Sequence, residues 1–203
     1  MKAGYLEHGA VCALQAAVTK SPRPRTGAWL PLAVSLETGL RIGDVVSLPA
    51  GALDGDTISY VAQKTGKRGR AKIPFTLAEE IRAGANALWL FPSPYQGGTT
   101  HLTRQAVWKR LKRAARRAGL AEEGVSPHSM RKVFAVDLHA REGLAAVQKA
   151  LQHSRIDVTE LYALSDYLSA ANADKPLTRA DVPTIIHLAV DAIQAALKKS
   201  RNA

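Results

Sequence analysis

The sequence predicts a mainly helical domain with one small antiparallel sheet. Along most of the 203 residues, apolar side chains recur at the spacing of buried helix faces. Strict alternation of apolar and polar residues, which is typical of a strand, is confined to residues 57–62. Because 46% of the residues are hydrophobic and 22% are charged, the chain can bury the core of one domain, which excludes global disorder.

Three helices are expected before the sheet. Residues 3–19 and 27–37 both carry helical apolar spacing, and the proline-containing segment between them breaks the chain. Gly39 is expected to end the second helix in the left-handed conformation, which glycine adopts without steric cost. A short helix over 41–48 follows and ends at Pro49.

The expected sheet lies between residues 52 and 74. Residues 57–62 form its clearest strand, a basic turn runs from Lys64 to Arg70, and the chain returns over 71–74. Residues 52–55 can add a third short strand. The sequence therefore predicts a hairpin with positive charges at its tip.

Helices dominate the rest of the chain. Residues 92–101 are expected to form a loop, and residues 169–180 a polar linker. The last helix is amphipathic and spans about 182–199. The other helices are expected at about 77–86, 103–118, 128–141, 144–152 and 157–164.

The charge balance points to a polyanionic partner. The chain has 28 Lys plus Arg against 17 Asp plus Glu, a formal net charge of +11, which most simply indicates nucleic acid. A basic ribosomal or membrane-surface protein would have a similar balance. Two segments, 64–72 and 104–117, hold no acidic residue, so we predict phosphate contacts there rather than only a solvated face. The predicted DNA-binding residues are Lys67, Arg68, Arg70, Arg104, Lys109, Arg110, Lys112, Arg113, Arg116 and Arg117.

Several other classes of protein do not fit the sequence. A single cysteine, Cys12, excludes a disulfide scaffold and cysteine-rich zinc motifs. No apolar run approaches the roughly 18 residues of a membrane span, so we expect a soluble protein without a membrane partner. The six histidines form no cluster with carboxylates, and single pairs one turn apart, such as His139 and Glu142, do not make a site, which argues against a metal nuclease. We expect no metal and no cofactor.

A further group of residues suggests a site that handles phosphate. His128 and Arg131 are three residues apart and project from the same side of the first turn of a helix. The helix dipole favours an anion at that end. His153 follows Arg131 by 22 residues, and Tyr162 follows His153 by nine. Taken singly, a capping histidine, a surface arginine and a half-buried tyrosine are more common than catalytic ones.

Five motifs follow one another between about residues 26 and 165. They are Thr38-Gly39-Leu40-Arg41-Ile42-Gly43-Asp44-Val45, Gln63-Lys64-Thr65-Gly66-Lys67, His128-x-x-Arg131, Leu151-Gln152-His153-Ser154 and Tyr162. In this combination and order they resemble the catalytic domain of the tyrosine recombinase (phage integrase) family. None of the departures from the commonest pattern replaces a residue that the family's chemistry requires. These departures are Lys132, Gln152, Ala163 and Leu164, and they bear on the subfamily.

The resemblance implies a site-specific recombinase that cleaves and rejoins DNA through a 3′-phosphotyrosyl intermediate, in integration, excision or inversion. Tyr162 would be the nucleophile, and Tyr167, five residues further on, is the less well spaced alternative. Arg41 and Arg131 would hold the phosphate oxygens, a task for which the planar guanidinium is better suited than an ammonium. No ATP is needed, because the phosphotyrosyl link conserves the energy of the broken bond.

The same resemblance assigns the proton transfers. Lys64 would protonate the leaving 5′ oxygen, with Lys67 as its rival, and its turn is expected to have no core that fixes it. His128 would handle the proton of the nucleophile, and His153 would donate a hydrogen bond to the phosphate. Asp44 is expected to support the arginine of its own helix.

Two alternatives share the same fold. One is a type IB topoisomerase-like activity, which uses the same nucleophile. The other is a non-catalytic DNA-binding protein, which would be free to lose the catalytic residues that are complete in this chain.

The resemblance also divides the chain. Residues 1–165 would form the catalytic domain, and 166–203 a linker and amphipathic helix that can dock on a neighbouring protomer or on their own domain. The family's usual N-terminal core-binding domain is expected to be absent, which fits either a shortened chain or a natural single-domain form, like the short recombinases that invert fimbrial promoters. The implied partner is double-stranded DNA. We expect a cytoplasmic, nucleoid-associated protein, monomeric in isolation and tetrameric on paired DNA sites.

Overall fold

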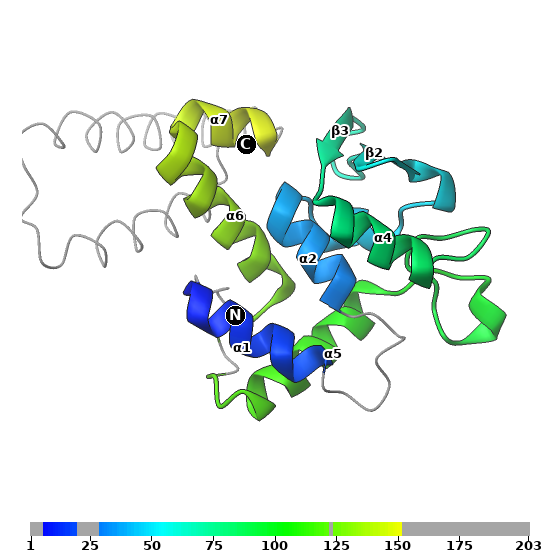
Figure 1. Ribbon diagram of the computed structural model, residues 1–203, viewed down its shortest axis with the longest axis horizontal. Coiled ribbons are helices and arrows are strands. Elements are labelled where there is room, and N and C mark those ends of the chain that lie inside the picture. Colours follow the sequence, from blue (N-terminus) through cyan, green and yellow to red (C-terminus); the bar gives the residue numbers. More distant parts are fainter. Residues whose placement is uncertain (1–5, 20–28, 122–123, 152–203) are drawn as a thin grey trace, which may run out of the picture. The chain divides into compact units, whose positions relative to one another are not determined.

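The computed structural model describes residues 6–19, 29–121 and 124–151, which lie in one compact unit, Met1–Arg155. The segments predicted at 157–164, 169–180 and 182–199 lie outside the described residues. The described helices are α1 (His8–Thr19), α2 (Trp29–Thr38), α3 (Ile42–Val46), α4 (Phe75–Gly84), α5 (Arg104–Arg117), α6 (Pro127–Glu142) and α7 (Leu144–Ala150) (Figure 1). Short 3-10 turns occur at Ala50–Ala52 and Gln96–Gly98.

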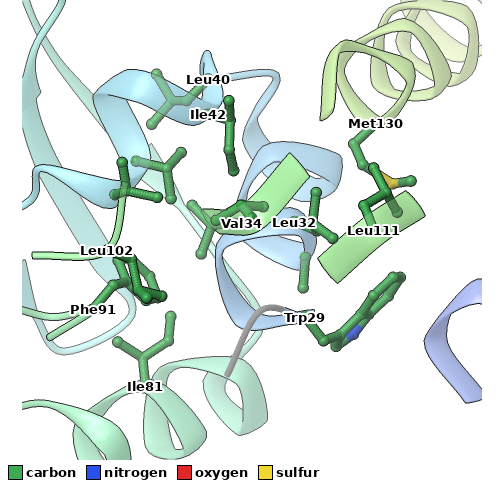
Figure 2. Close-up of a cluster of buried hydrophobic side chains, with 14 of the residues drawn as sticks. Trp29, Leu32, Val34, Leu40, Ile42, Ile81, Phe91, Leu102, Leu111 and Met130 are labelled. Atoms are coloured by element: carbon green, nitrogen blue, oxygen red, sulfur yellow. The ribbon is translucent and has the colours of Figure 1, made fainter. Parts of the chain in front are cut away.

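Helix α2 is the centre of the core. It packs against α4 and α6, and also against α3 (Figure 1). Leu32 and Val34 of α2 are fully buried, and so are Leu111 of α5 and Met130 of α6 (Figure 2). Because neighbours cover α2 on more than one side, its apolar residues do not form a single stripe, which is the pattern of a buried helix.

Two further helix pairs extend this core. Helix α1 packs against α5, and α7 packs against α6. His8 Nε2 of α1 lies 3.3 Å from Asp137 Oδ1 of α6, on the exposed side of the contact. Together these pairings join the N-terminal part of the described chain to the helices that follow the sheet.

The sheet is three-stranded and antiparallel, in the order β1 (Leu53–Asp54), β2 (Thr57–Val61) and β3 (Arg68–Lys72). Ile58 is fully buried and pairs with Leu53 on one side and Ala71 on the other, so the centre of the sheet faces the core.

Strand β3 begins at Arg68, three residues before the predicted start. Arg68 pairs with Val61 and Arg70 pairs with Ser59, so these two arginines belong to the ladder and not to the turn. Charged side chains fit there because alternate residues of this edge strand face solvent.

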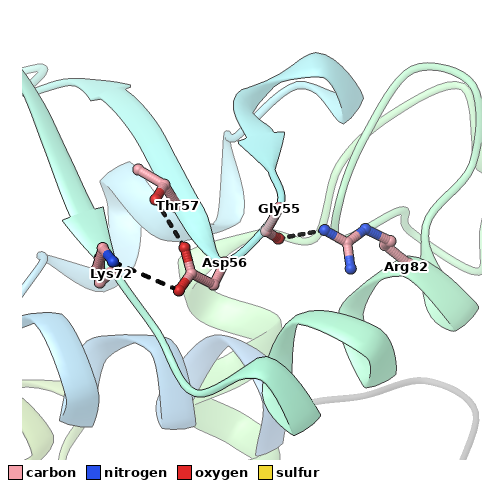
Figure 3. A network of polar contacts seen from close by, with 5 residues as sticks. All are labelled: Gly55, Asp56, Thr57, Lys72 and Arg82. Atoms are coloured by element: carbon pink, nitrogen blue, oxygen red, sulfur yellow. Dashed lines mark hydrogen bonds and ion pairs between the residues drawn. The ribbon is translucent and has the colours of Figure 1, made fainter.

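Polar contacts brace the base of the hairpin. The Asp56 carboxylate accepts a hydrogen bond from Thr57 Oγ1 at 3.0 Å and lies 3.8 Å from Lys72 Nζ (Figure 3). The guanidinium of Arg82 in α4 donates to the carbonyl oxygen of Gly55 (Figure 3). The turn between β1 and β2 is therefore tied to α4.

The predicted fold class, mainly helical with a small antiparallel sheet, is confirmed. Helix α3 ends at Val46 rather than at residue 48, because the Ser47 hydroxyl bonds to the carbonyl oxygens of Gly43 and Asp44 and Pro49 offers no N–H group. Helix α4 begins at Phe75, directly after Pro74, two residues earlier than predicted. None of the helices in the described ranges combines the length and hydropathy of a bilayer-spanning segment.

Candidate active site

Arg131 is held from two directions by backbone carbonyl groups. Its side chain is only 4% exposed. One terminal nitrogen donates to the carbonyl oxygen of Gly39, and the other lies 3.5 Å from the carbonyl oxygen of Leu151. Arg131 of α6 therefore joins the turn after α2 to the end of α7. A buried guanidinium needs such acceptors, since an unpaired charge in a protein interior is costly.

Arg41 lies beside the same turn. It is the N-cap residue of α3, with an extended backbone conformation and a half-buried side chain. Gly39, whose carbonyl binds Arg131, is two residues before Arg41. The structure thus brings Arg131 to the segment that carries Arg41, although 90 positions separate the two in the sequence.

Close packing makes glycine necessary at position 39. Its φ of +67° lies in the left-handed region. A Cβ atom there would lie 2.6 Å from Phe134 Cε1 and 2.7 Å from Leu151 Cδ2. The missing side chain lets α6 and α7 approach the turn closely enough for Arg131 to reach its carbonyl oxygen.

His128 lies in the first turn of α6, on the side of Arg131. The side chain of His128 is exposed, whereas that of Arg131 is buried. The Ser126 N–H donates to Ser129 Oγ at 3.2 Å, and the Ser129 N–H donates to the Ser126 carbonyl oxygen at 2.9 Å, which fixes the backbone that presents both residues. The neighbouring Lys132, one of the departures from the family pattern, is only 7% exposed.

The residue before Lys64 is hydrogen-bonded to α3 and to its C-cap residue. Asp44 Oδ1 accepts the backbone N–H of Gln63 at 3.1 Å, and Gln63 Nε2 donates to Ser47 Oγ at 2.8 Å. Asp44, only 6% exposed, thus supports the residue before Lys64, and its expected support of Arg41 stays a prediction. The Lys64 and Lys67 side chains are both exposed.

Two side chains of the predicted site are not described. His153 and Tyr162, like the alternative Tyr167, lie outside the described residues. Leu151, whose carbonyl oxygen binds Arg131, is the last described residue before them. Their roles therefore stay predictions.

Residues of the first basic segment form one exposed face. Arg68 and Arg70 alternate with half-buried residues along β3, and both are exposed, as is Lys67 in the preceding turn. An open pocket of about 570 Å³ lies beside this face, lined by Arg68 and Arg70 of β3, Tyr60 of β2 and Ser47 directly after α3, among others.

Helix α5 divides the second basic segment between surface and interior. Its apolar side, with Val107, Leu111, Ala114 and Ala115, is buried. The exposed basic residues are Arg104, Lys109, Arg113, Arg116 and Arg117. Three of them, at positions 109, 113 and 116, follow one another at helical spacing on the side away from the core.

Two of the predicted DNA-binding residues are less accessible. Lys112 is only 7% exposed, and its ammonium lies 5.7 Å from the centre of the Trp108 ring. Arg110 is half-buried, and burial lowers the pKa of its guanidinium; the nearby Tyr95 opposes this shift, and Arg113 adds to it. The guanidinium nevertheless stays charged at neutral pH.

Gln63 and Ser47 had no predicted role, although both make the contacts next to Lys64. The only signal for Gln63 was its position directly before Lys64. Within the described ranges, no group of three or more His, Cys, Asp or Glu residues could hold a metal ion.

Comparison with known proteins identifies a family and several relatives. The model of the phage integrase family matches residues 5–169. The tyrosine recombinase XerD of Rhizobium meliloti (strain 1021) is 38% identical over 136 residues, covering 62% of this chain and 43% of the relative. XerD of Agrobacterium fabrum (strain C58 / ATCC 33970) is 33% identical over 177 residues, covering 74% of this chain and 53% of the relative. The chain thus spans about half the length of these relatives.

Solved structures show the same fold. A lambda integrase dimer bound to a COC′ core site superimposes with a TM-score of 0.66 at 17% identity, covering 80% of this chain and 48% of that one. XerA recombinase also gives a TM-score of 0.66 at 17% identity, covering 87% of this chain and 66% of that one. The predicted catalytic-domain fold is therefore confirmed.

Proposed function

Because the chain belongs to the phage integrase family, we propose that it is the catalytic part of a tyrosine-type site-specific recombinase, which cleaves and rejoins double-stranded DNA. The observation that carries the proposal is the contact of Arg131 with the carbonyl oxygen of Gly39, two residues before Arg41. This contact holds Arg131 at the segment that carries Arg41, and the family's chemistry assigns both arginines to one phosphate.

The arginines supply charge where the reaction needs it. In the attack on a phosphodiester, negative charge shifts over the non-bridging oxygens, and preorganised donors lower the barrier because they do not have to reorient. Arg131 is fixed by two carbonyl groups, and Arg41 lies at the first turn of α3. The two planar guanidinium groups can therefore hold the phosphate from two sides.

The covalent step balances without a cofactor. The Tyr162 oxygen attacks phosphorus, and its proton passes to His128. The bond from phosphorus to the 5′ oxygen breaks, and that oxygen takes a proton from Lys64. The products are a 3′-phosphotyrosyl link and a free 5′ hydroxyl. Attack by the 5′ hydroxyl of another strand reverses every step and completes strand exchange, while His153 donates a hydrogen bond to the phosphate.

The basic surfaces provide the contacts with the duplex. We propose that Lys67, Arg68 and Arg70 hold one stretch of DNA backbone and that the exposed side of α5 holds another. Helix α5 contributes Arg104, Lys109, Arg110, Arg113, Arg116 and Arg117, whereas the buried Lys112 is the least accessible of the predicted set.

Assembly and organisation follow the same proposal. A lambda integrase with this fold forms a tetramer bound to a Holliday junction. We propose a monomer that assembles into a tetramer on paired DNA sites, associated with the nucleoid. In this arrangement residues 1–165 form the catalytic domain, and residues 166–203 form a tail that docks in cis or in trans.

A suicide-substrate assay tests the function. Nicked duplexes drawn from DNA that flanks the gene are incubated with the protein and scored for a covalent complex on a denaturing gel. The nick lets the short 5′ fragment diffuse away, so the phosphotyrosyl complex accumulates. We expect a covalent complex. Complexes that appear on a native gel but on no denaturing gel would instead identify a DNA-binding protein without catalysis. Relaxation of supercoils without paired sites would favour a topoisomerase-like activity.

A further inference from the structure

Gln63 makes two hydrogen bonds, one to helix α3 and one to Ser47 directly after this helix. Its backbone N–H donates to Asp44 Oδ1 at 3.1 Å, and its side-chain Nε2 donates to Ser47 Oγ at 2.8 Å. Ser47 Oγ also lies 3.1 Å from the carbonyl oxygen of Gly43 and 3.2 Å from that of Asp44. A hydroxyl has one proton and two lone pairs, so Ser47 can donate into its own helix and still accept from Gln63.

The turn that follows Gln63 is closed at its base. The Ala62 carbonyl oxygen accepts the N–H groups of Thr65 at 3.1 Å and Gly66 at 2.8 Å, and the Ala62 N–H donates to the Lys67 carbonyl oxygen at 2.9 Å. Gly66 has a φ of +68°, which lets the chain reverse within these few residues. Since Ala62 is only 5% exposed, the base of the turn is fixed to the domain, and Lys64 follows directly after the anchored Gln63.

We propose that Gln63 is a positioning residue for the cleavage reaction: by its hydrogen bonds to Ser47 and Asp44, it fixes the turn that carries Lys64 onto helix α3. The inference rests on the proposed function, in which Lys64 protonates the leaving 5′ oxygen. Helix α3 begins directly after Arg41. The two hydrogen bonds of Gln63 therefore hold Lys64, the general acid, at a fixed place relative to Arg41, which binds the same phosphate.

The expected effect of losing Gln63 on the cleavage rate follows from the strength of its hydrogen bond to Ser47. The hydrogen bond between Gln63 and Ser47 is solvent-exposed, so water competes for both groups when the bond is absent. The net contribution of such a bond corresponds to about a two- to tenfold change in an equilibrium or a rate. Loss of the bond releases the turn only in part, because the backbone N–H of Gln63 still reaches Asp44.

The test compares two leaving groups in single-turnover cleavage of nicked duplexes. One duplex has the natural oxygen at the 5′ bridging position, and the other has sulfur there. A thiolate leaves without being protonated, because a thiol has a pKa of about 8.5, far below that of an alcohol. A defect in the general acid, or in its position, therefore slows cleavage of the oxygen duplex and spares the sulfur duplex.

We expect Gln63→Ala to slow cleavage of the oxygen duplex by about two- to tenfold, with unchanged DNA affinity and near wild-type cleavage of the sulfur duplex. Ser47→Ala should give the same pattern, Ser47→Thr should restore cleavage because it keeps the hydroxyl, and the double variant should lose no more than either single variant. Equal losses on both duplexes would identify a general structural defect and overturn the inference, as would wild-type rates on both.

Two reference variants separate this inference from the proposed function. Lys64→Ala should slow cleavage of the oxygen duplex far more than Gln63→Ala does, and its cleavage rate should recover on the sulfur duplex. Recovery in Lys67→Ala but not in Lys64→Ala would move the acid to Lys67 and overturn the role of Gln63, while the recombinase proposal would stand. If the wild-type chain forms no covalent complex with either duplex, the proposed function fails and the inference falls with it.

Discussion

Replacing Gly39 by alanine tests how the turn between α2 and α3 supports Arg131. The new side chain has two costs. A left-handed alanine costs about 1–2 kcal/mol relative to its preferred conformations. Its Cβ would also lie 2.6 Å from Phe134 Cε1 and 2.7 Å from Leu151 Cδ2, and such overpacking costs about 1–3 kcal/mol. We therefore expect Gly39→Ala to lower the free energy of unfolding by about 2–5 kcal/mol.

Gly119 provides a matched control. Its φ of +69° is close to the +67° of Gly39, but no atom lies within 4 Å of a Cβ built at this position. Gly119→Ala should therefore carry the backbone cost alone, about 1–2 kcal/mol. For a domain of this size, about 1 kcal/mol changes Tm by roughly 2–4 °C. The difference between the two variants in a thermal melt measures the packing of α6 and α7 on the turn.

Activity gives the second part of this prediction. We expect the turn to move away from α6 to relieve the contact and to carry with it the Gly39 carbonyl oxygen that binds Arg131. We expect single-turnover cleavage to fall by about tenfold or more in Gly39→Ala at a temperature where it remains folded, since small displacements of catalytic groups are costly. Gly119→Ala should cleave at the wild-type rate. Equal losses of stability and cleavage in both variants would refute the argument.

The remaining predictions separate DNA binding, chemistry and stability. Arg113→Ala should weaken binding to all duplexes alike and lower the salt slope of the binding constant by about one, which a titration over salt concentration would show. Lys112→Ala should leave that slope unchanged and lower Tm instead, because Lys112 is buried against Trp108; a changed slope would place its ammonium on DNA. Arg131→Ala should abolish covalent-complex formation with a smaller effect on affinity, and parallel losses of both would mean that Arg131 only contributes to a charged surface.

The sequence predicted the elements of the fold well because their signals are local. The alternation at 57–62 and the helical apolar spacing do not depend on distant contacts, and most helix ends agree with the structure within two residues. The start of β3 was missed because Arg68 and Arg70 look like turn residues until their pairing with β2 is known. Edge strands tolerate such charges, so composition alone does not mark them.

The candidate site was predicted in part, and the part that was missed depends on tertiary contacts. The motifs predict that Arg41 and Arg131 belong to the site, but the carbonyl groups that hold Arg131 are backbone atoms and leave no signature in the sequence. Asp44 and Gln63 are 19 positions apart in the sequence, so residue types alone could not predict that they contact each other. The accessibility of Lys112 likewise depends on which side of α5 packs inward.

Identification of the amino acid that becomes linked to DNA tests the central claim most directly. The covalent complex from the suicide substrate is digested with protease, and the peptide that carries the DNA remnant is identified by mass spectrometry. We predict attachment at Tyr162 through a 3′ phosphate, and loss of the complex in Tyr162→Phe but not in Tyr167→Phe. Attachment at Tyr167 would reverse the assignment of the nucleophile. Attachment at a residue other than tyrosine, or through a 5′ phosphate, would contradict the proposed chemistry.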